Sequence, residues 1–548
     1  MQKRLTFYFI SFFIALFTQQ VSAQNSVARP KLVVGIVIDQ MRWDYLYRYY
    51  DVFKSTGAFK RMLGEGFTCE NTFIPYTPTV TAAGHTCVYT GSVPAVHGIV
   101  GNNWHDNILN KDFYCTDDDS VQTVGSNTAA GKMSPRNMLA TTIGDELRLA
   151  TNFKSIVIGV AIKDRGAILP AGHSANAAYW YDYKTGDFIT STYYMNALPA
   201  WVNTFNSRKL TDSLYALNWN TILPKDVYAK YCTDDAKDYE NKPLGTDQLK
   251  FPYDLSKFIG KDYGKIASTP YGNTLTEAMA EATVKAEHLG KNNVTDFLAV
   301  SFSSPDYIGH SFGPNSWEQL DDYVRLDETL GKFLSFLDAT VGKGQYTVFL
   351  TADHGVAHIP NFSIENKLPG GAFNDAKLVT QINEGLKTKY NVDKLMSGIN
   401  NYQVVLNKAT IDSAKISKDE ICNWIINYLL QQKEIAQAFK ETALMQTTLT
   451  TKQKDMFANG YFPARCGDVA FILKPGYVEG TGNGTSHGLW NPYDSHIPML
   501  WYGWGIKHGA TNHENYMTDI APTVAALLHI QMPSGCVGHV IEEVMKAQ

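Results

Sequence analysis

The sequence predicts an α/β fold in which a mostly parallel central sheet is sandwiched by helices, with two inserted segments that cap it. Three observations carry this prediction. Short, continuously apolar runs indicate buried parallel strands, helical patterns alternate with these runs, and two long stretches interrupt the alternation.

Residues 1–23 have the composition of a cleaved export signal. Lys3 and Arg4 give a positive start, residues 5–17 are mostly apolar, and residues 21–23 (Val-Ser-Ala) have the small-residue spacing of a cleavage site. A membrane anchor is the alternative, but the apolar run is shorter than the roughly 20 residues that span a bilayer. We therefore predict a periplasmic or secreted protein that keeps no membrane anchor after signal cleavage.

Composition narrows the class of protein. The 548 residues carry 48 Lys and Arg against 53 Asp and Glu, a formal net charge of −5, which argues against a broad nucleic-acid-binding surface. With 44% hydrophobic and 18% charged residues, the chain is neither disordered nor fibrous. Seven scattered cysteines without CxxC spacing predict neither a disulfide scaffold nor a cysteine-rich metal site.

Apolar runs and helical patterns place the elements along the chain. Strands are predicted at 32–38, 156–162, 297–302, 347–350 and 497–502. Helices are predicted at 134–150, 275–289, 316–337 and 518–528. In the last helix, Thr518 and Asp519 can cap the start, and Pro522 falls in the first turn, where proline is tolerated.

Two stretches break this alternation. Residues 174–265 are rich in Tyr, Trp, Asn and Asp and have little periodicity. Residues 361–455 carry a Pro-Gly-Gly turn at 369–371 and a helical pattern of their own at 418–439. Because functional loops project from a rigid sheet, we expect both stretches to be insertions that cap or border the site.

Carboxylate and imidazole side chains follow three of the predicted strands. Asp39 ends the first, Asp306 and His310 follow the third, and Asp353 and His354 follow the fourth. A single Asp at the end of a buried strand is usually no more than a cap for the following helix or turn. Ligands of open α/β sheets bind beyond the carboxyl ends of the strands, so the recurrence on three strands predicts a site at that edge.

The spacing of these residues suits metal ligation. Asp306 and His310 are four apart and would share one helical face, and Gly355 permits an irregular turn after Asp353 and His354. His487, in the glycine-rich stretch 480–488, completes three Asp and three His, a donor set that suits two Zn²⁺ better than Mg²⁺ or Ca²⁺. Two such ions about 4 Å apart can clamp the attacking and leaving oxygens of an in-line displacement. The other histidines are predicted to be structural: 85, 97, 105, 173, 288, 358, 496, 508, 513, 529 and 539.

Residues 75–85 (PYTPTVTAAGH) form a loop that enters a helix. A threonine there would lie at the positive end of the helix dipole, where backbone amides bind anions. Its hydroxyl is a poor nucleophile unless a metal or a base deprotonates it. A lone PTxT segment would more simply provide a helix cap.

In combination, these motifs closely resemble the alkaline phosphatase superfamily. They are VIDQ (37–40), PTVTAAGHTCVYTGSVPAVHGIVGNNW (78–104), SPDYIGH (304–310), ADHG (352–355) and TSHG (485–488). The resemblance is to the branch that contains nucleotide pyrophosphatase/phosphodiesterases and the bacterial phosphate-irrepressible alkaline phosphatases. Because the motifs span nearly the whole mature chain, it implies one alkaline phosphatase-like catalytic domain over residues 24–548, with the two insertions.

The resemblance also implies roles for individual residues. It implies that Asp39, Thr81, Asp353 and His354 hold one zinc ion and that Asp306, His310 and His487 hold the other. Thr81, rather than Thr79, would be the nucleophile, because the second hydroxyl of the PTxT pair is the reactive one in the family. Asn102 matches the asparagine that donates to a phosphoryl oxygen.

Lys163 and Arg165 bear on the substrate class. They are two residues apart, so an extended segment would project both to the same side. The alternative is an exposed strand end in which they pair with Asp164. In the phosphomonoesterases of the branch that the chain resembles, a Lys-x-Arg here contacts the phosphoryl oxygens, and diesterases lack it. Two fixed cations also suit a monoester dianion, whose transition state spreads charge over its equatorial oxygens.

The sequence thus predicts an exported di-zinc phosphomonoesterase that cleaves a broad range of small phosphate monoesters through a phosphothreonine intermediate. We expect it to act as a monomer. A phosphodiesterase or nucleotide pyrophosphatase of the same superfamily is the alternative. An inactive exported metal- or anion-binding protein is a further alternative, but it would have lost a ligand or the nucleophile, and the sequence retains all of them.

Overall fold

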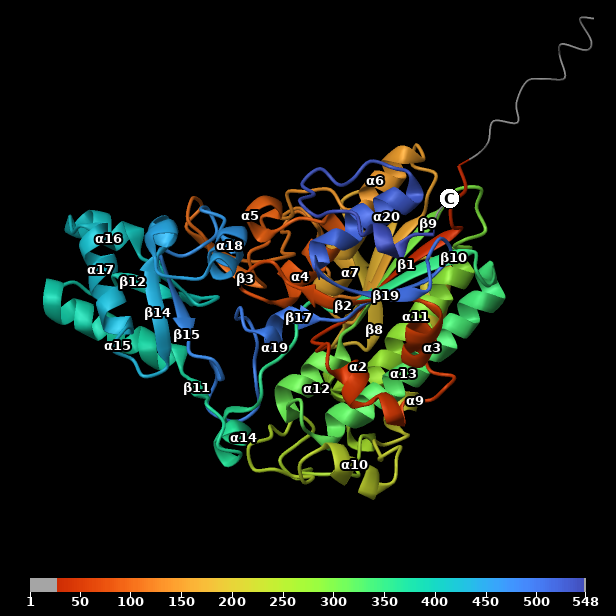
Figure 1. Cartoon of the computed structure of the whole chain (residues 1–548), viewed down its shortest axis with the longest axis horizontal. Helices are drawn as coiled ribbons and strands as arrows, with labels where there is room; N and C mark the ends of the chain where they lie inside the picture. Colours follow the sequence, from red (N-terminus) through yellow and green to blue (C-terminus); the bar gives the residue numbers. More distant parts are fainter. Residues whose placement is uncertain (1–26, 547–548) are drawn as a thin grey trace, which may run out of the picture.

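The chain folds into a large lobe and a smaller lobe, shown on the right and the left of Figure 1. The structure is a computed structural model that describes residues 27–546, so the predicted export signal lies outside the described residues. The large lobe is built on an eleven-stranded sheet, and the smaller lobe on a four-stranded one.

The centre of the main sheet is parallel. β1 (Leu32–Ile38) lies between β10 (Tyr346–Thr351) and β9 (Asp296–Phe302), and β6 (Val157–Ala161) and β7 (Ala177–Asp182) continue beyond β9. These five strands pair in parallel with one another. All seven residues of β1 are buried, which explains its continuous apolar sequence. The predicted fold class is confirmed.

Antiparallel strands flank this parallel centre. β18 (Met499–Gly503) runs antiparallel to both β10 and β2 (Phe67–Phe73). The prediction of one parallel strand at 497–502 is therefore wrong. Pro498, which has no N–H to donate, separates β18 from the short β17 (His496–Ile497). The sheet is completed by β8 (Asp187–Ser191), β5 (Thr123–Val124) and β19 (Gly509–Tyr516).

Helices cover both faces of the main sheet (Figure 1). One face carries α4 (Thr81–Thr90), α6 (Ile143–Ala150), α7 (Asp164–Ala171) and α20 (Ile520–Leu528). The other carries α3 (Ala58–Glu65), α11 (Tyr271–Ala286), α12 (Ser304–Phe312) and α13 (Trp317–Leu337).

Capping residues fix where two of these helices begin. Ser316 caps α13 by accepting from the Gln319 N–H, at the start that the sequence predicts. The helix predicted at 134–150 instead begins at Ile143. There, Thr142 and Asp145 form a capping box, in which each side chain accepts from the backbone N–H of the other residue.

The two predicted insertions have different structures. Within 174–265, β7 and β8 extend the main sheet, and the remainder includes α8 (Ala200–Ser207), α9 (Leu210–Tyr215) and α10 (Lys225–Tyr231). Residues 361–455 supply most of the smaller lobe. The boundaries of both insertions remain a prediction.

The smaller lobe has its own sheet and its own core. Its sheet follows the order β12 (Met396–Asn400), β13 (Gln403–Leu406), β15 (Val469–Leu473) and β14 (Ile435–Lys440). Its helices include α15 (Asp375–Tyr390), α16 (Lys408–Ala414), α17 (Lys418–Leu429) and α18 (Thr451–Gly460). The segment predicted as one helix at 418–439 instead contains α17, a turn and most of β14. Ile382, Val404, Ile425 and Phe471 belong to a hydrophobic cluster separate from that of the large lobe.

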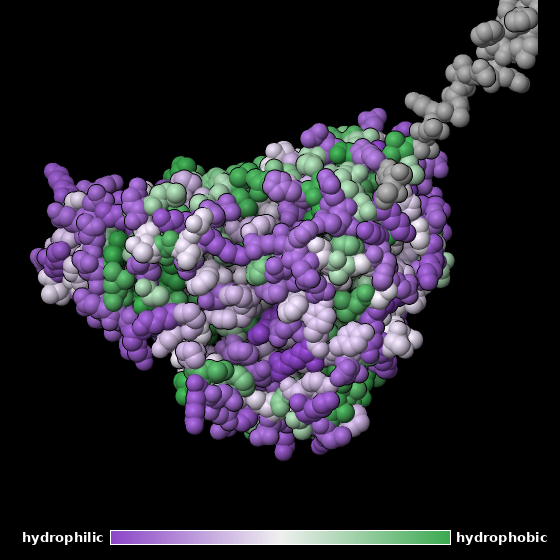
Figure 2. Space-filling view, in the orientation of Figure 1, coloured by the Kyte–Doolittle hydropathy of each residue, from purple (hydrophilic) through white to green (hydrophobic). Residues whose placement is uncertain are grey.

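Three surface and chain features complete the description. The face in Figure 2 is mainly hydrophilic, and its hydrophobic residues form separate patches. Across residues 27–546, no helix combines the length and apolar character that a membrane crossing requires. All seven cysteines are free thiols.

Candidate active site

Neighbouring strands bring the predicted ligands to one edge of the main sheet. Asp39 directly follows β1, and Asp353 and His354 follow β10 beside it. Asp306 and His310 lie on α12, which starts just after β9 on the other side of β1. Parallel strands end at a common edge, so side chains from distant parts of the sequence meet there.

Asp39, Asp353 and His354 form the first compact group. Each offers one ligand atom, and these atoms lie within 4.8 Å of one another. His354 Nε2 is 3.6 Å from Asp39 Oδ1 and 3.5 Å from Asp353 Oδ2, and all three side chains are fully buried. Thr81 Oγ1 lies 3.4 Å from the same nitrogen, so the threonine hydroxyl borders this group.

Asp306, His310 and His487 form the second group. Asp306 Oδ1 is 3.2 Å from His310 Nε2 and 3.8 Å from His487 Nε2. The ring of His487 stacks on that of His354 with centroids 3.5 Å apart, so the two groups adjoin. Gly484 allows the glycine-rich loop to come this close. It has a φ of +63°, and a Cβ there would lie 2.6 Å from the His310 carbonyl oxygen.

A backbone carbonyl orients each imidazole of the two groups. Because a carbonyl oxygen only accepts hydrogen bonds, each neutral ring carries its proton on Nδ1 and turns the Nε2 lone pair toward the carboxylates. Histidines that ligate metals are held in this way. The Nδ1 atoms of His310, His487 and His354 donate to the carbonyls of Thr485 at 2.7 Å, Thr79 at 2.7 Å and Gly355 at 3.0 Å.

Buried carboxylate oxygens that no N–H or O–H of the described backbone or of a described non-histidine side chain reaches indicate that the site fits metal ions. Within residues 27–546, Asp39 Oδ1 and Asp353 Oδ2 are buried, and their contacts are with imidazole nitrogens alone: His354 Nε2 at 3.6 Å from Asp39 Oδ1, and His85 Nδ1 at 3.2 Å and His354 Nε2 at 3.5 Å from Asp353 Oδ2. Burial, together with the charges of Asp306 and Asp353, raises the pKa of Asp39 well above its usual value. Buried carboxylates stay ionised when they are paired or coordinate a metal. Cations held by the two groups would supply the missing partners.

Lys163 lies between the two groups. Its Nζ donates to Asp39 Oδ2 at 2.6 Å and to Asp306 Oδ2 at 2.5 Å, and its side chain is only 2% exposed. Burial acts to lower the pKa of Lys163, but the carboxylates of Asp306 and Asp39 outweigh it and raise the pKa, so the ammonium stays charged. The alternative of a solvated lysine is therefore wrong.

Arg165 approaches from a helix rather than from an extended segment. α7 begins at Asp164, so Arg165 lies in its first turn, and the expectation that both cations project from one strand is wrong. Arg165 Nη1 donates to the Tyr114 hydroxyl at 3.0 Å, and that hydroxyl donates to Asp164 Oδ1 at 2.9 Å. This chain of hydrogen bonds fixes the guanidinium.

Asn102 contacts the helix that carries Thr81. Thr81 is the first residue of α4, and Asn102 Oδ1 accepts from the Ala82 N–H at 2.9 Å. This bond uses the carbonyl end of the Asn102 side chain, so its NH₂ group is left to donate to a ligand.

His85 has a larger part in the site than the sequence predicts. Its Nδ1 lies 2.9 Å from the Thr81 carbonyl oxygen and 3.2 Å from Asp353 Oδ2, and its Nε2 lies 2.8 Å from Ser301 Oγ. The spacing of four residues from Thr81, one turn along α4, is the signal that could have found it. The ten other histidines predicted to be structural belong to neither group.

Gln40 is a second residue that sequence reasoning missed. Its backbone N–H donates to Asp353 Oδ1 at 3.0 Å, and its side-chain NH₂ donates to Asp306 Oδ1 at 2.7 Å, so it joins one carboxylate of each group. It does so with a left-handed φ of +66°. No sequence pattern marks this conformation.

Comparison with known proteins places this site in a family. The family model for type I phosphodiesterases and nucleotide pyrophosphatases matches residues 33–494, a range that contains both ligand groups, Thr81, Asn102, Lys163 and Arg165. The chain therefore belongs to the type I phosphodiesterase/nucleotide pyrophosphatase family.

Individual relatives are similar along almost their whole length. Alkaline phosphatase PhoV of Synechococcus elongatus is 51% identical over 522 residues, which cover 95% of this chain and 94% of PhoV. Alkaline phosphatase PafA of Elizabethkingia meningoseptica is 46% identical over 524 residues and 95% of each chain. A Myroides odoratus protein named a calcium-transporting ATPase is 48% identical over 535 residues and 97% of each chain.

A solved structure is also similar over almost the whole chain. The crystal structure of wild-type PafA superposes with a TM-score of 0.93, covering 95% of this chain and all of that one. This agreement extends the fold assignment to the insertions as well as to the central sheet.

Proposed function

We propose that the chain is an exported alkaline phosphatase that hydrolyses a broad range of small phosphate monoesters through a covalent phosphothreonine. One observation carries the proposal: the Thr81 hydroxyl lies at the N-terminus of α4, 3.4 Å from His354 Nε2 and beside two adjoining ligand groups. The alkaline phosphatase names of PhoV and PafA support a phosphomonoesterase.

We infer two Zn²⁺ per chain. Donor sets of oxygen and imidazole nitrogen suit zinc, and each group leaves room for a further ligand in a tetrahedral shell. When bound, such a pair of ions stabilises the attacking and leaving oxygens of an in-line displacement. Asp39, Thr81, Asp353 and His354 would hold one ion, and Asp306, His310 and His487 the other.

Thr81 carries out the two half-reactions. The Thr81 hydroxyl releases its proton to solvent and its Oγ1 bonds to phosphorus, while the bond from phosphorus to the alcohol oxygen breaks. The alcohol leaves as an alkoxide that takes a proton from solvent. The N-terminus of α4 places the positive end of the helix dipole at the reacting group. Water then attacks the phosphothreonine from the vacated side, which releases inorganic phosphate and restores the hydroxyl.

Asn102, Lys163 and Arg165 hold the phosphoryl group throughout. The free NH₂ of Asn102 donates to one oxygen. The two cations offset the charge of the dianion as it spreads over the equatorial oxygens. Their positions, Lys163 against the metal-binding carboxylates and Arg165 fixed by Tyr114, support this assignment.

A phosphodiesterase is the rival function, because the matching family model is named for it. A diester replaces one charged oxygen with an organic group, so two fixed cations that contact the phosphoryl group would favour monoesters. The test compares kcat/KM for p-nitrophenyl phosphate with that for methyl p-nitrophenyl phosphate, using zinc-supplied protein. We expect the monoester to be preferred. Preference for the diester would establish the rival function. If the protein turned over neither ester, it would be an inactive binding protein instead.

ATP is a useful third substrate in this assay, because the Myroides relative is named an ATPase. Broad use predicts that phosphate is released from ATP as well as from simple monoesters, with the same loss in Thr81→Ala. Hydrolysis of ATP that survives Thr81→Ala would point to a different site.

We also propose that residues 1–23 direct export to the periplasm or the medium. Residues 24–548 would then act as one monomeric catalytic domain, with insertions at 174–265 and 361–455. Cell fractionation and N-terminal sequencing test the first point, and we expect a mature chain that begins at Gln24. An uncleaved cytoplasmic chain would contradict it. Size-exclusion chromatography with light scattering tests the oligomeric state, and we expect the mass of one chain.

A further inference from the structure

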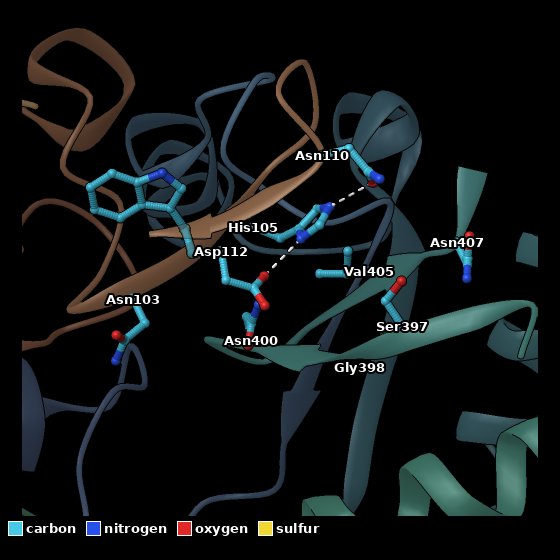
Figure 3. A pocket seen from close by; sticks show the side chains of 10 residues that line it. Asn103, His105, Asn110, Asp112, Ser397, Gly398, Asn400, Val405 and Asn407 are labelled. Carbon is cyan, nitrogen blue, oxygen red and sulfur yellow. Dashed lines mark hydrogen bonds and ion pairs between the residues drawn. The ribbon is translucent and has the colours of Figure 1, made fainter. Parts of the chain in front are cut away.

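A cavity of about 610 Å³ lies between the two lobes. One wall is the hairpin of β3 (Asn103–Asp106) and β4 (Lys111–Tyr114), and the other is formed by β12 and β13 of the smaller lobe (Figure 3). None of the catalytic or metal-binding residues proposed above lines this cavity.

Gly398 opens one wall of the cavity. The register of β12 against β13 shifts between Met396 and Gly398, which is the mark of a β-bulge. A Cβ added at Gly398 would meet no atom within 4 Å, so there is open space beside this glycine, which lines the cavity. Glycines at bulges often mark places where a ligand approaches the backbone closely.

The polar side chains of the cavity suit hydroxyl groups. Amides and hydroxyls donate and accept at once, which matches the alternating needs of a polyol. In Figure 3 the side chains of His105 and Asp112 lie close together, and Nδ1 of His105 is 2.7 Å from Asp112 Oδ1. The polar lining includes Asn103, His105, Asp112, Ser397, Asn400 and Asn407.

The charge and shape of the cavity limit the chemical class of ligand further. Among the described residues that line the cavity, none is Lys or Arg, while Asp112 contributes a carboxylate, so an anionic group is disfavoured. Trp104 also borders the cavity, but it is only 2% exposed and offers no face on which a nucleobase could stack. An uncharged, hydroxyl-rich ligand fits both constraints.

The cavity is linked to the candidate active site through the turn between β12 and β13. Asn401 Nδ2 donates to the Asn103 carbonyl at 3.1 Å, and Asn103 directly follows Asn102. The Tyr402 hydroxyl donates to the His487 carbonyl at 3.2 Å. One short turn therefore contacts the chain beside a phosphate-binding residue and a metal-binding residue while its strands form the cavity wall.

We propose that this cavity binds a saccharide or polyol unit. The ligand has two possible sources. It is either the alcohol part of a phosphate ester substrate, an interpretation that rests on the proposed phosphatase function, or a free saccharide that is not a substrate. The first source makes the cavity a determinant of substrate preference. The second makes it a separate saccharide site at the junction of the lobes.

The experiment fills the cavity. Gly398→Phe places a ring in the open space, and Gly64→Phe is the matched control, because a Cβ at Gly64 on α3 also meets no atom within 4 Å. Both variants and the parent protein are assayed on glucose 6-phosphate and on p-nitrophenyl phosphate, and are titrated calorimetrically with glucose and maltotriose. His105→Ala, which removes a lining side chain without adding bulk, serves if Gly398→Phe fails to fold.

A substrate subsite predicts that Gly398→Phe lowers kcat/KM for glucose 6-phosphate about tenfold relative to p-nitrophenyl phosphate, with no such change in the control. A free-saccharide site predicts an unchanged ratio but loss of maltotriose binding. If neither the ratio nor the binding differs from the parent protein, the proposal is wrong. A chain that hydrolyses no phosphate ester would refute the phosphatase function, and the titration would still test the cavity.

Discussion

The double substitution Lys163→Ala with Arg165→Ala should turn the proposed enzyme away from monoesters. Lys163 Nζ lies 2.6 and 2.5 Å from carboxylates of the two ligand groups, and Arg165 is fixed by Tyr114, so both cations are preorganised at the site. They therefore offset charge on the phosphoryl group without first having to be ordered.

The magnitude follows from two charge-assisted hydrogen bonds. Each contributes about 1.5–3 kcal/mol, so losing both costs about 3–6 kcal/mol of transition-state stabilisation, or roughly 10² to 10⁴ in kcat/KM for a monoester. A diester has one fewer charged oxygen for these groups to contact, so its kcat/KM should fall by about tenfold or less.

The assay measures kcat/KM of parent and variant protein on p-nitrophenyl phosphate and methyl p-nitrophenyl phosphate. Zinc content must be measured alongside, because removing the Lys163 ammonium leaves Asp39 and Asp306 without that partner. Lys209→Ala removes a half-exposed lysine that pairs with Asp187 and is the control. Equal losses on the two substrates, at full zinc content, would show that Lys163 and Arg165 do not discriminate between the two esters and have a structural role instead.

Three further predictions concern the nucleophile, the junction of the lobes and a buried acid. Thr81→Ala should lower monoester turnover by about 10³-fold or more while Thr81→Ser keeps much of it; equal activity of the two variants would exclude a hydroxyl nucleophile. Tyr402→Phe removes the hydrogen bond to the His487 carbonyl and should lower the free energy of unfolding by about 1 kcal/mol in urea titrations; an unchanged value would show that this bond contributes nothing. Burial raises the pKa of Glu441 to about 8, from 4.5, so its contribution to stability is full below pH 4.5 and is lost as pH rises toward 8. Glu441→Gln should therefore gain stability relative to the parent protein between pH 5 and 9, by up to roughly 5 kcal/mol, and a difference in Tm that is constant with pH would contradict this.

The central strands could be predicted because a parallel strand buried on both faces has to be apolar throughout. β1 matches its predicted range residue for residue. Strand direction could not be predicted in the same way. β18 is buried and apolar like the parallel central strands, but it runs antiparallel to β10. The apolar pattern of 418–439 continues from α17 into β14, so periodicity alone did not reveal the change.

Most of the candidate site could be predicted because its ligands lie at the carboxyl ends of predicted strands. Asp39, Asp353 and His354 meet because β1 and β10 are neighbours. The alternation of strands and helices predicts that both strands end at the same edge of the sheet, but it does not predict that they are adjacent. The directions of Lys163 and Arg165 were not predictable from their spacing, because α7 begins between them.

The residues that sequence reasoning missed act through tertiary contacts. Gln40 joins Asp353 and Asp306 only in its left-handed conformation, and His85 reaches Asp353 across the packing of α4 against the end of β10. Neither contact has a counterpart in the local sequence apart from the four-residue spacing of His85 from Thr81.

The metal content of purified, active protein is the decisive measurement for the two proposed ion sites. Elemental analysis of the parent protein should give two zinc ions per chain, chelation should abolish monoester turnover, and added zinc should restore it. His487→Ala should retain about one ion, because the group of Asp39, Asp353 and His354 is intact in it. Full turnover by protein with less than one transition-metal ion per chain would show that catalysis does not depend on metal ions held by these two groups.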